Sequence, residues 1–221
     1  MDAKQNRLPW YAVAVLVTGL LVVTPGCVGL LAQVLYWSGG AEVPPEFDGL
    51  EGKRVAVVCV ADSASSFGPG TDTLFLARSV GKLLREKVEE IDVVRPDEIA
   101  DWIDRHDWNE VDFAEVGRGV KADMVLAIEL TGLSLYDGQT LYKGRANLKF
   151  RVLDLADEGK EIFSRKLPEV TFPATGAYAA TDASEPKFRQ MFLQVLAERI
   201  ARHFYTREMW DDYSTDPTVI S

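Results

Sequence analysis

The sequence has few cysteines and histidines and a deficit of positive charge. Its 221 residues include two cysteines, two histidines, and 24 lysines and arginines against 34 aspartates and glutamates. Two cysteines exclude a disulfide framework and a cysteine-rich metal site. The net charge of −10 argues against nucleic acid as a partner, because phosphate binding needs a basic surface. It also argues against docking of the folded part on anionic lipid headgroups.

Charged residues are missing altogether from one long stretch near the N-terminus. No Asp, Glu, Lys or Arg occurs from Leu8 to Trp37, and a helix needs about 20 apolar residues to cross a bilayer. Lys4 and Arg7 precede this stretch, and acidic residues follow it. This charge order places the N-terminus in the cytoplasm. We therefore expect residues 1–37 to be a signal peptide or membrane anchor, with the folded part outside the cytoplasm, on the periplasmic side.

Two interpretations of Cys27 are open. The basic start, the apolar run AVAVLVTGLLVV and the small residue before Cys27 resemble a bacterial lipoprotein signal, whose cysteine is acylated and becomes the first mature residue. This resemblance implies lipidation of Cys27. However, the apolar run continues past Cys27 through VGLLAQVLYW, which favours an uncleaved membrane-spanning helix. In both interpretations the N-terminal segment tethers the protein to a membrane.

The rest of the chain is expected to form a linker, one globular domain and a tail. Residues 38–52 are rich in glycine, proline and acid, which is typical of a linker. Residues 53–206 carry regular hydrophobic patterns and are predicted to fold into the globular domain. Residues 207–221 are predicted to be a flexible tail.

The hydrophobic pattern of residues 53–206 predicts an α/β (α+β) domain. The run RVAVVCVA is typical of a strand buried on both faces, and apolar residues at helical spacing follow it. We expect a mixed sheet, parallel at first and antiparallel at its end, with helices packed on it. The predicted order is β-α-β-α-α-β-β-β-α. The strands are expected at 54–61, 91–95, 124–137, 141–155 and 161–172. One helix is expected at 73–90, a second to begin at Pro96, a third to end near Gly119 and a fourth at 187–210, with a loop at 173–186.

This order and several short motifs resemble a domain of bacterial envelope proteins. The matching stretches are KRVAVVCVADS, RSVGKLLREKV, IDVVRPDEIADWI, VKADMVLAIELTGLSLYD and GRANLKFRVLDLADEGKEIFSRKL. The domain is shared by the curli-secretion lipoproteins, the N-terminal domain of the Tol-system β-propeller protein and lipoprotein activators of peptidoglycan synthases. The resemblance covers residues 53–204. It implies an accessory protein outside the cytoplasm that binds envelope proteins, and homo-oligomers are common among the resembled families.

Candidate catalytic and metal-binding residues form no recognised constellation. The serines within 63–66 lack the GxSxG turn of a nucleophilic serine. Asp104, His106 and Asp107 are too close in sequence to share one zinc-binding helical face. Cys59, in the middle of a predicted strand, is expected to be a buried structural thiol. The sequence thus predicts a protein that is not an enzyme, with no catalytic residue, metal or cofactor.

Aromatic residues are the candidates for partner contacts. Trp102 and Trp108 lie in the acidic stretch 97–115, and Tyr136 and Tyr178 lie at the edges of predicted turns or loops. Aromatic side chains at such positions are typical interface anchors, although they equally suit the edge of a core. The acidic stretch fits a solvated helical face, and the sharper hypothesis is a docking surface for a basic partner.

Two functional hypotheses follow. The first is a membrane-anchored accessory or scaffolding protein, lipidated at Cys27, that works through protein–protein contacts at the cell envelope. The second is a single-pass membrane protein that serves as a subunit of an envelope transport system, or that carries a small-ligand or enzymatic pocket. A concave pocket lined by several groups with shifted pKa values would favour the second hypothesis.

Overall fold

The computed structural model describes residues 42–61, 71–106, 112–181 and 184–208. The larger of its two compact units extends from Val43 to Ser221. The predicted anchor with Cys27, and also Trp108, lie outside the described residues. None of the helices within the described ranges is long and apolar enough to cross a membrane.

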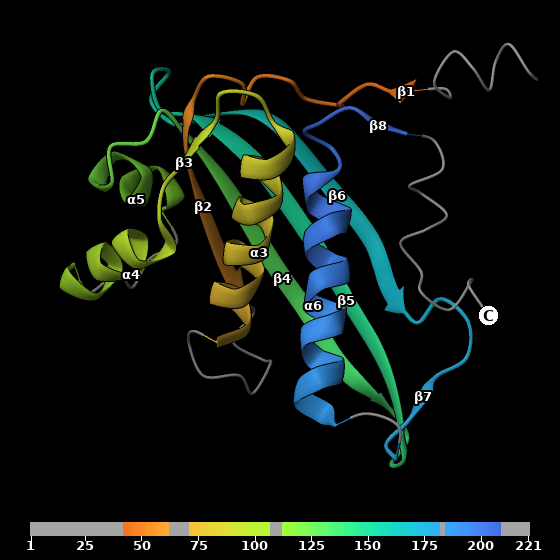
Figure 1. Cartoon of the computed structure of the whole chain (residues 1–221). Helices are drawn as coiled ribbons and strands as arrows, with labels where there is room; N and C mark the ends of the chain where they lie inside the picture. Colours follow the sequence, from red (N-terminus) through yellow and green to blue (C-terminus); the bar gives the residue numbers. More distant parts are fainter. Residues whose placement is uncertain (1–41, 62–70, 107–111, 182–183, 209–221) are drawn as a thin grey trace, which may run out of the picture. The chain divides into compact units, whose positions relative to one another are not determined.

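A mixed sheet forms the centre of this unit, with the strand order β3-β2-β4-β5-β6 (Figure 1). The second strand pairs in parallel with both of its neighbours, and the last three strands form an antiparallel meander. The predicted α+β class and mixed sheet are therefore confirmed. The strands are β2 (Arg54–Ala61), β3 (Asp92–Val93), β4 (Met124–Asp137), β5 (Leu141–Asp154) and β6 (Lys160–Phe172).

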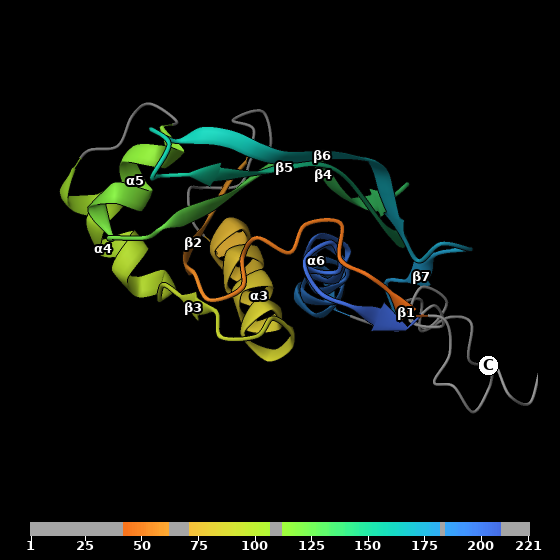
Figure 2. The same cartoon turned by 90° about the horizontal axis from the view of Figure 1, so that it is seen from above.

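Two helices cover one face of the sheet and build the larger core. These are α3 (Thr71–Lys87) and α6 (Glu185–Ala201), which lie side by side as a second layer (Figure 2). Successive side chains of a strand point to opposite faces, so β2 contributes Val55 and Val57 to this core. The meander contributes residues such as Phe150, which is fully buried.

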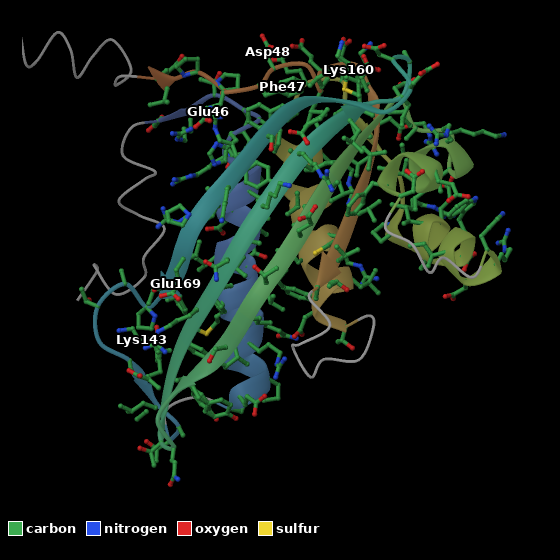
Figure 3. All side chains as sticks on the ribbon, turned by 180° about the vertical axis from the view of Figure 1, so that it is seen from behind. Glu46, Phe47, Asp48, Lys143, Lys160 and Glu169 are labelled. Atoms are coloured by element: carbon green, nitrogen blue, oxygen red, sulfur yellow. The ribbon has the colours of Figure 1, made fainter. Side chains whose placement is uncertain are left out.

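Two shorter helices cover the opposite face only in part. They are α4 (Pro96–Arg105) and α5 (Phe113–Gly119), and they pack against β2 and the start of β4 in a smaller core. Ala56 and Val58, the alternate residues of β2, point into this second core. Burial on both faces explains why β2 is a continuous apolar run. No helix of the described residues covers the rest of this face, which is formed by β4, β5 and β6 and is called the open face below (Figure 3).

The end of the last helix differs from the prediction. The amphipathic pattern predicts a helix to Trp210, but α6 ends at Ala201, so that prediction is wrong. The backbone N–H groups of His203 and Phe204 bond to carbonyls three residues earlier, which tightens the chain into a turn. This turn directs both side chains into the core, where they are buried.

Short strands occur beyond the predicted ones. β7 (Tyr178–Ala179) pairs with the start of β5 inside the segment predicted as a loop. β1 (Glu42–Val43) and β8 (Arg207–Glu208) pair with each other. Within the predicted linker, Leu50 is fully buried and Phe47 packs against the larger core.

Candidate functional site

Trp102 joins α4 to α5. Its ring stacks on that of His106, with 4.2 Å between the ring centroids. Nδ1 of His106 lies 2.8 Å from the backbone oxygen of Trp102. The indole also lies against Gly119, where any side chain would collide with it. Trp102 is therefore half-buried at the edge of the smaller core.

Tyr136 and Tyr178 lie near the N-terminus of α6. Tyr136 is 44% exposed, and its hydroxyl donates a hydrogen bond to Glu185. This hydrogen bond raises the pKa of Tyr136 and lowers the pKa of Glu185. Tyr178 is half-buried, with its ring centroid 5.7 Å from that of Phe188 on α6. Tyr136 thus offers more contact area to a partner than Tyr178 does.

Two of the described contact residues lie on opposite faces of the sheet. Trp102 packs against the smaller core on one face of the sheet, and Tyr178 packs against the larger core on the other. Trp108 and Cys27 lie outside the described residues. The role of these side chains as partner contacts stays a prediction.

The outer side of α4 is acidic. Pro96 at the first helical position and acids in the first turn favour the start of this helix. Asp97, Asp101 and Asp104 follow at helical spacing and are exposed. Asp97 and Asp101 each make one ion pair at 3.5 Å, to exposed arginines. Such exposed pairs contribute little to stability, so the acidic surface remains available to a basic partner.

A buried ion pair links α3 to α6. Asp72 in the first turn of α3 is only 8% exposed, and one of its oxygens lies 2.7 Å from Nη1 of Arg189. Nη2 of Arg189 donates to Glu185 at 2.6 Å. Burial alone would lower the pKa of Arg189, but its bonds to Glu185 and Asp72 raise it. The guanidinium therefore stays charged and holds the two helix starts together.

The buried side chain of His203 joins the residues before β2 to the end of α6. Nδ1 of His203 lies 2.9 Å from Oε1 of Glu46, poorly aligned for a hydrogen bond, and Arg165 Nε donates to the other oxygen of Glu46 at 2.6 Å. The backbone oxygen of His203 accepts from the N–H groups of Glu46 and Phe47. Burial would raise the pKa of Glu46, but the hydrogen bond from Arg165 and the charges of His203 and Arg165 lower it.

The burial of His203 leads us to expect a loss of stability in mild acid. Burial lowers its pKa below the ordinary 6.5, and the charges of Arg202 and Arg207 act in the same direction, against Glu46. The unfolded chain therefore binds the proton more readily than the folded one. The stabilising contribution is complete above pH 6.5 and is lost as the pH falls below it. We expect the free energy of unfolding to fall between pH 6.5 and pH 5 by up to about 1.4 kcal/mol per pH unit from this one group.

Denaturant unfolding of the detergent-solubilised full chain at several pH values measures this slope. The His203→Gln variant should lose most of the slope above pH 5, where Glu46 stays ionised because its pKa lies below its ordinary 4.5. His106→Gln is the matched control, because His106 is exposed at the C-terminal end of α4, and it should keep the slope. An unchanged slope in the His203 variant would contradict the assignment.

The described surface contains two shallow hollows beside α5. One, of about 420 Å³, is lined by residues that include Lys53, Asp123 and Asp154. The other, of about 300 Å³, lies between α5 and the open face and is lined by residues that include Phe113 and Arg151. Both hollows are lined by groups of both charge signs.

Cys59 has the environment of a structural thiol. It is half-buried near the end of β2 and packs against the larger core. Burial raises the pKa of the Cys59 thiol, so the thiol stays protonated and weakly nucleophilic at neutral pH. Within the described residues, His, Cys, Asp and Glu form no group of three that could hold a metal ion.

Two features were not predicted from the sequence. The first is the contact of His203 with Glu46, because these residues are far apart in the sequence. The second is a row of basic side chains on β5. The sequence carries a signal for this row, because lysines and arginines stand at alternate positions of LYKGRANLKFRVLD.

Comparisons with solved structures find distant neighbours, each of the three given below with a TM-score under 0.5. No family profile matches the sequence, and no curated protein matches it. The PelC dodecamer of Paraburkholderia phytofirmans has 11% identity over 76% of this chain and 97% of that chain, with a TM-score of 0.47. Lipoprotein GNA1162 of Neisseria meningitidis has 17% identity over 67% of this chain and 97% of that chain, with a TM-score of 0.43. A minor lipoprotein of Acinetobacter baumannii has 15% identity over 68% of this chain and 90% of that chain, with a TM-score of 0.36.

Two of these three neighbours are bacterial lipoproteins.

Proposed function

We propose that this protein is a membrane-anchored accessory protein that acts outside the cytoplasm through contacts with other envelope proteins, without catalysing a reaction. One observation carries the proposal. A stretch of chain without any charged residue, Leu8–Trp37, is followed within a few residues by a compact unit that begins at Val43. This order supports a tether followed by a folded domain that is presented at a membrane surface.

The short tether limits where the domain works. If Cys27 carries the lipid, 15 residues lie between it and Val43, and this stretch spans at most about 55 Å when fully extended. Partners within that distance of the membrane meet the domain at a high effective concentration. Weak surface contacts, such as those of the acidic α4 and of Tyr136, are then sufficient for function.

The anchoring step has a direct test. We expect the protein purified from membranes in detergent to have the mass of residues 27–221 plus a diacylglycerol and, if the new N-terminus is acylated, one further acyl chain. The Cys27→Ser variant should lose the lipid mass and the cleavage, because the serine hydroxyl cannot replace the thiolate as the acceptor. Intact-mass measurement of both proteins checks this.

Cys59→Ser is the matched control, because Cys59 is the only other cysteine of the chain. It should keep the lipid mass of the parent protein. An unmodified full-length mass in the parent would instead support the alternative proposal, a single-pass protein anchored by an uncleaved helix. The continuation of the apolar run beyond Cys27 is the observation that favours this alternative.

A further inference from the structure

The open face carries a row of positive charge along β5. Alternate residues of this strand, from Tyr142 to Val152, are buried in the larger core. The residues between them point to the open face and are half-buried. Four of these five residues are basic; this basic row consists of Lys143, Arg145, Lys149 and Arg151, with Asn147 at its centre.

Two lysines at the middle of the open face lie opposite each other. Lys149 on β5 pairs in register with Lys166 on β6. Like charges directly opposite each other on neighbouring strands destabilise a sheet. Neither lysine makes an ion pair with another described residue, whereas Arg151 lies 2.6 Å from Glu129 and Arg145 lies 3.1 Å from Asp137. On its other side Lys149 lies in register with Glu129 of β4, whose carboxylate forms its ion pair with Arg151 instead. Lys149 and Lys166 are thus a like-charged pair without an ion pair to another described residue, in a chain of net charge −10.

A recess adjoins one end of the basic row. The hollow of about 300 Å³ between α5 and the open face is lined in part by Arg118, Arg151 and Glu161. Figure 3 shows α4 and α5 beside the open strands, with Lys143 toward the other end of the face. A planar bilayer surface cannot follow such relief closely, whereas a protein segment can place a side chain in the recess.

We propose that the open face, centred on Lys149 and Lys166, binds an acidic segment of another envelope protein. The inference rests on the proposed function in taking the partner to be a protein, and it adds the partner's chemistry. Basic side chains on alternate strand residues recur every ~6.8 Å. Carboxylates on alternate residues of an extended segment have the same spacing. Two copies of this chain, each with a net charge of −10, repel each other at long range, so a second copy is not the occupant we infer.

The contact should be electrostatic and sensitive to salt. The face presents the basic row and Lys166, so we expect binding to depend on charge complementarity rather than on burial of apolar area. The test uses the full chain in detergent and a fluorescein-labelled peptide of alternating glutamate and glycine, with binding followed by fluorescence anisotropy. We expect binding that weakens as the salt concentration rises from about 0.05 M to about 0.5 M.

The decisive variant is the double substitution Lys149→Gln and Lys166→Gln. It should raise the dissociation constant of the peptide by about tenfold, since each lost exposed charge pair contributes a modest share of the binding. It should leave the thermal unfolding temperature unchanged or higher, because it removes a repulsive pair. The matched control is Lys82→Gln with Lys187→Gln, which removes the same charge from exposed positions on α3 and α6, and it should bind the peptide like the parent.

Three outcomes would overturn the inference. The first is equal affinity of the parent and the open-face variant, and the second is an equal loss in both double variants, which would show only a long-range effect of net charge. The third is that the open-face substitutions abolish binding to phosphatidylglycerol vesicles, or self-association in sedimentation, while peptide binding stays unchanged. A lipidated protein that fails to bind the peptide overturns this inference alone. If the protein binds the peptide but proves to have no membrane anchor, the inference about the open face stands and the proposed function is overturned.

Discussion

Shortening Phe150 to alanine should lower the free energy of unfolding by about 3–5 kcal/mol. Phe150 is fully buried on β5, and its ring lies 6.0 Å from that of Phe204 and 5.2 Å from that of His203, measured between centroids. Removing the ring loses its burial and leaves a cavity between the sheet and the end of α6, which the rigid surroundings fill only in part. Urea unfolding of the full chain in detergent, followed by tryptophan fluorescence, measures the change.

Leu141→Ala is the control for this substitution. Leu141 begins the same strand but is 40% exposed, so its truncation should change the stability by no more than about 0.5 kcal/mol. The slope of the unfolding free energy against urea concentration should be the same in all three proteins. A loss below about 1.5 kcal/mol for Phe150→Ala would mean that this aromatic cluster is not the centre of the core.

Replacing Arg189 with methionine should cost about 2–3 kcal/mol of stability. Methionine keeps much of the side-chain volume but leaves the carboxylate of Asp72 buried without its counter-charge. The expected cost is below that of a fully buried pair because the Arg189 side chain is 22% exposed. Urea unfolding at neutral pH measures it, and Lys187→Met, at an exposed position of the same helix, is the control.

A second substitution separates charge from packing at this pair. Adding Asp72→Asn to Arg189→Met removes the stranded charge, so the double variant should be more stable than the single Arg189 variant. If instead the two losses simply add, the link between α3 and α6 is not electrostatic. The side-chain packing of Arg189 would then account for its contribution.

The sheet could be predicted from the sequence because its strands repeat a simple pattern. β5 alternates buried and half-buried residues along its length, and the same alternation is legible in the sequence from Tyr142 to Val152. β2 is a continuous β-branched run because helices cover both of its faces. These patterns depend on whether each residue is buried or exposed. They were therefore sufficient to predict the fold class, the order of helices and strands, and the parallel and antiparallel parts of the sheet.

The ends of elements could not be predicted because tertiary contacts decide them. Nothing local ends α6 at Ala201; the turn that follows is stabilised by the burial of His203 and Phe204. Likewise, Phe47 and Leu50 lie in a stretch whose glycines, prolines and acids indicate a linker, yet both pack against the core. A single apolar residue in a polar stretch does not indicate which part of the core it will pack against.

The surroundings of the candidate contact residues could not be predicted from the sequence. Sequence reasoning weighed the aromatic residues one by one, but whether Tyr136 is exposed or Trp102 is half-buried depends on what packs beside it. The pairing of Lys149 with Lys166 depends on the register between two strands, which is set by irregularities at two points of the β5–β6 ladder. Such cross-strand neighbours are fixed only when the sheet is formed.

The contacts of the N-terminal segment also decide how the domain responds to mechanical force. A pull on the chain before Glu46 acts first on the pairing of β1 with β8. It then acts on the two backbone hydrogen bonds to His203 and on the ion pair of Glu46 with Arg165. The force breaks these few contacts one after another. In the long ladders between β4, β5 and β6, by contrast, many hydrogen bonds resist the force together. Tension along the tether is therefore absorbed by peeling the segment 46–50 from the end of α6. The sheet keeps its register under loads that have already lengthened the tether.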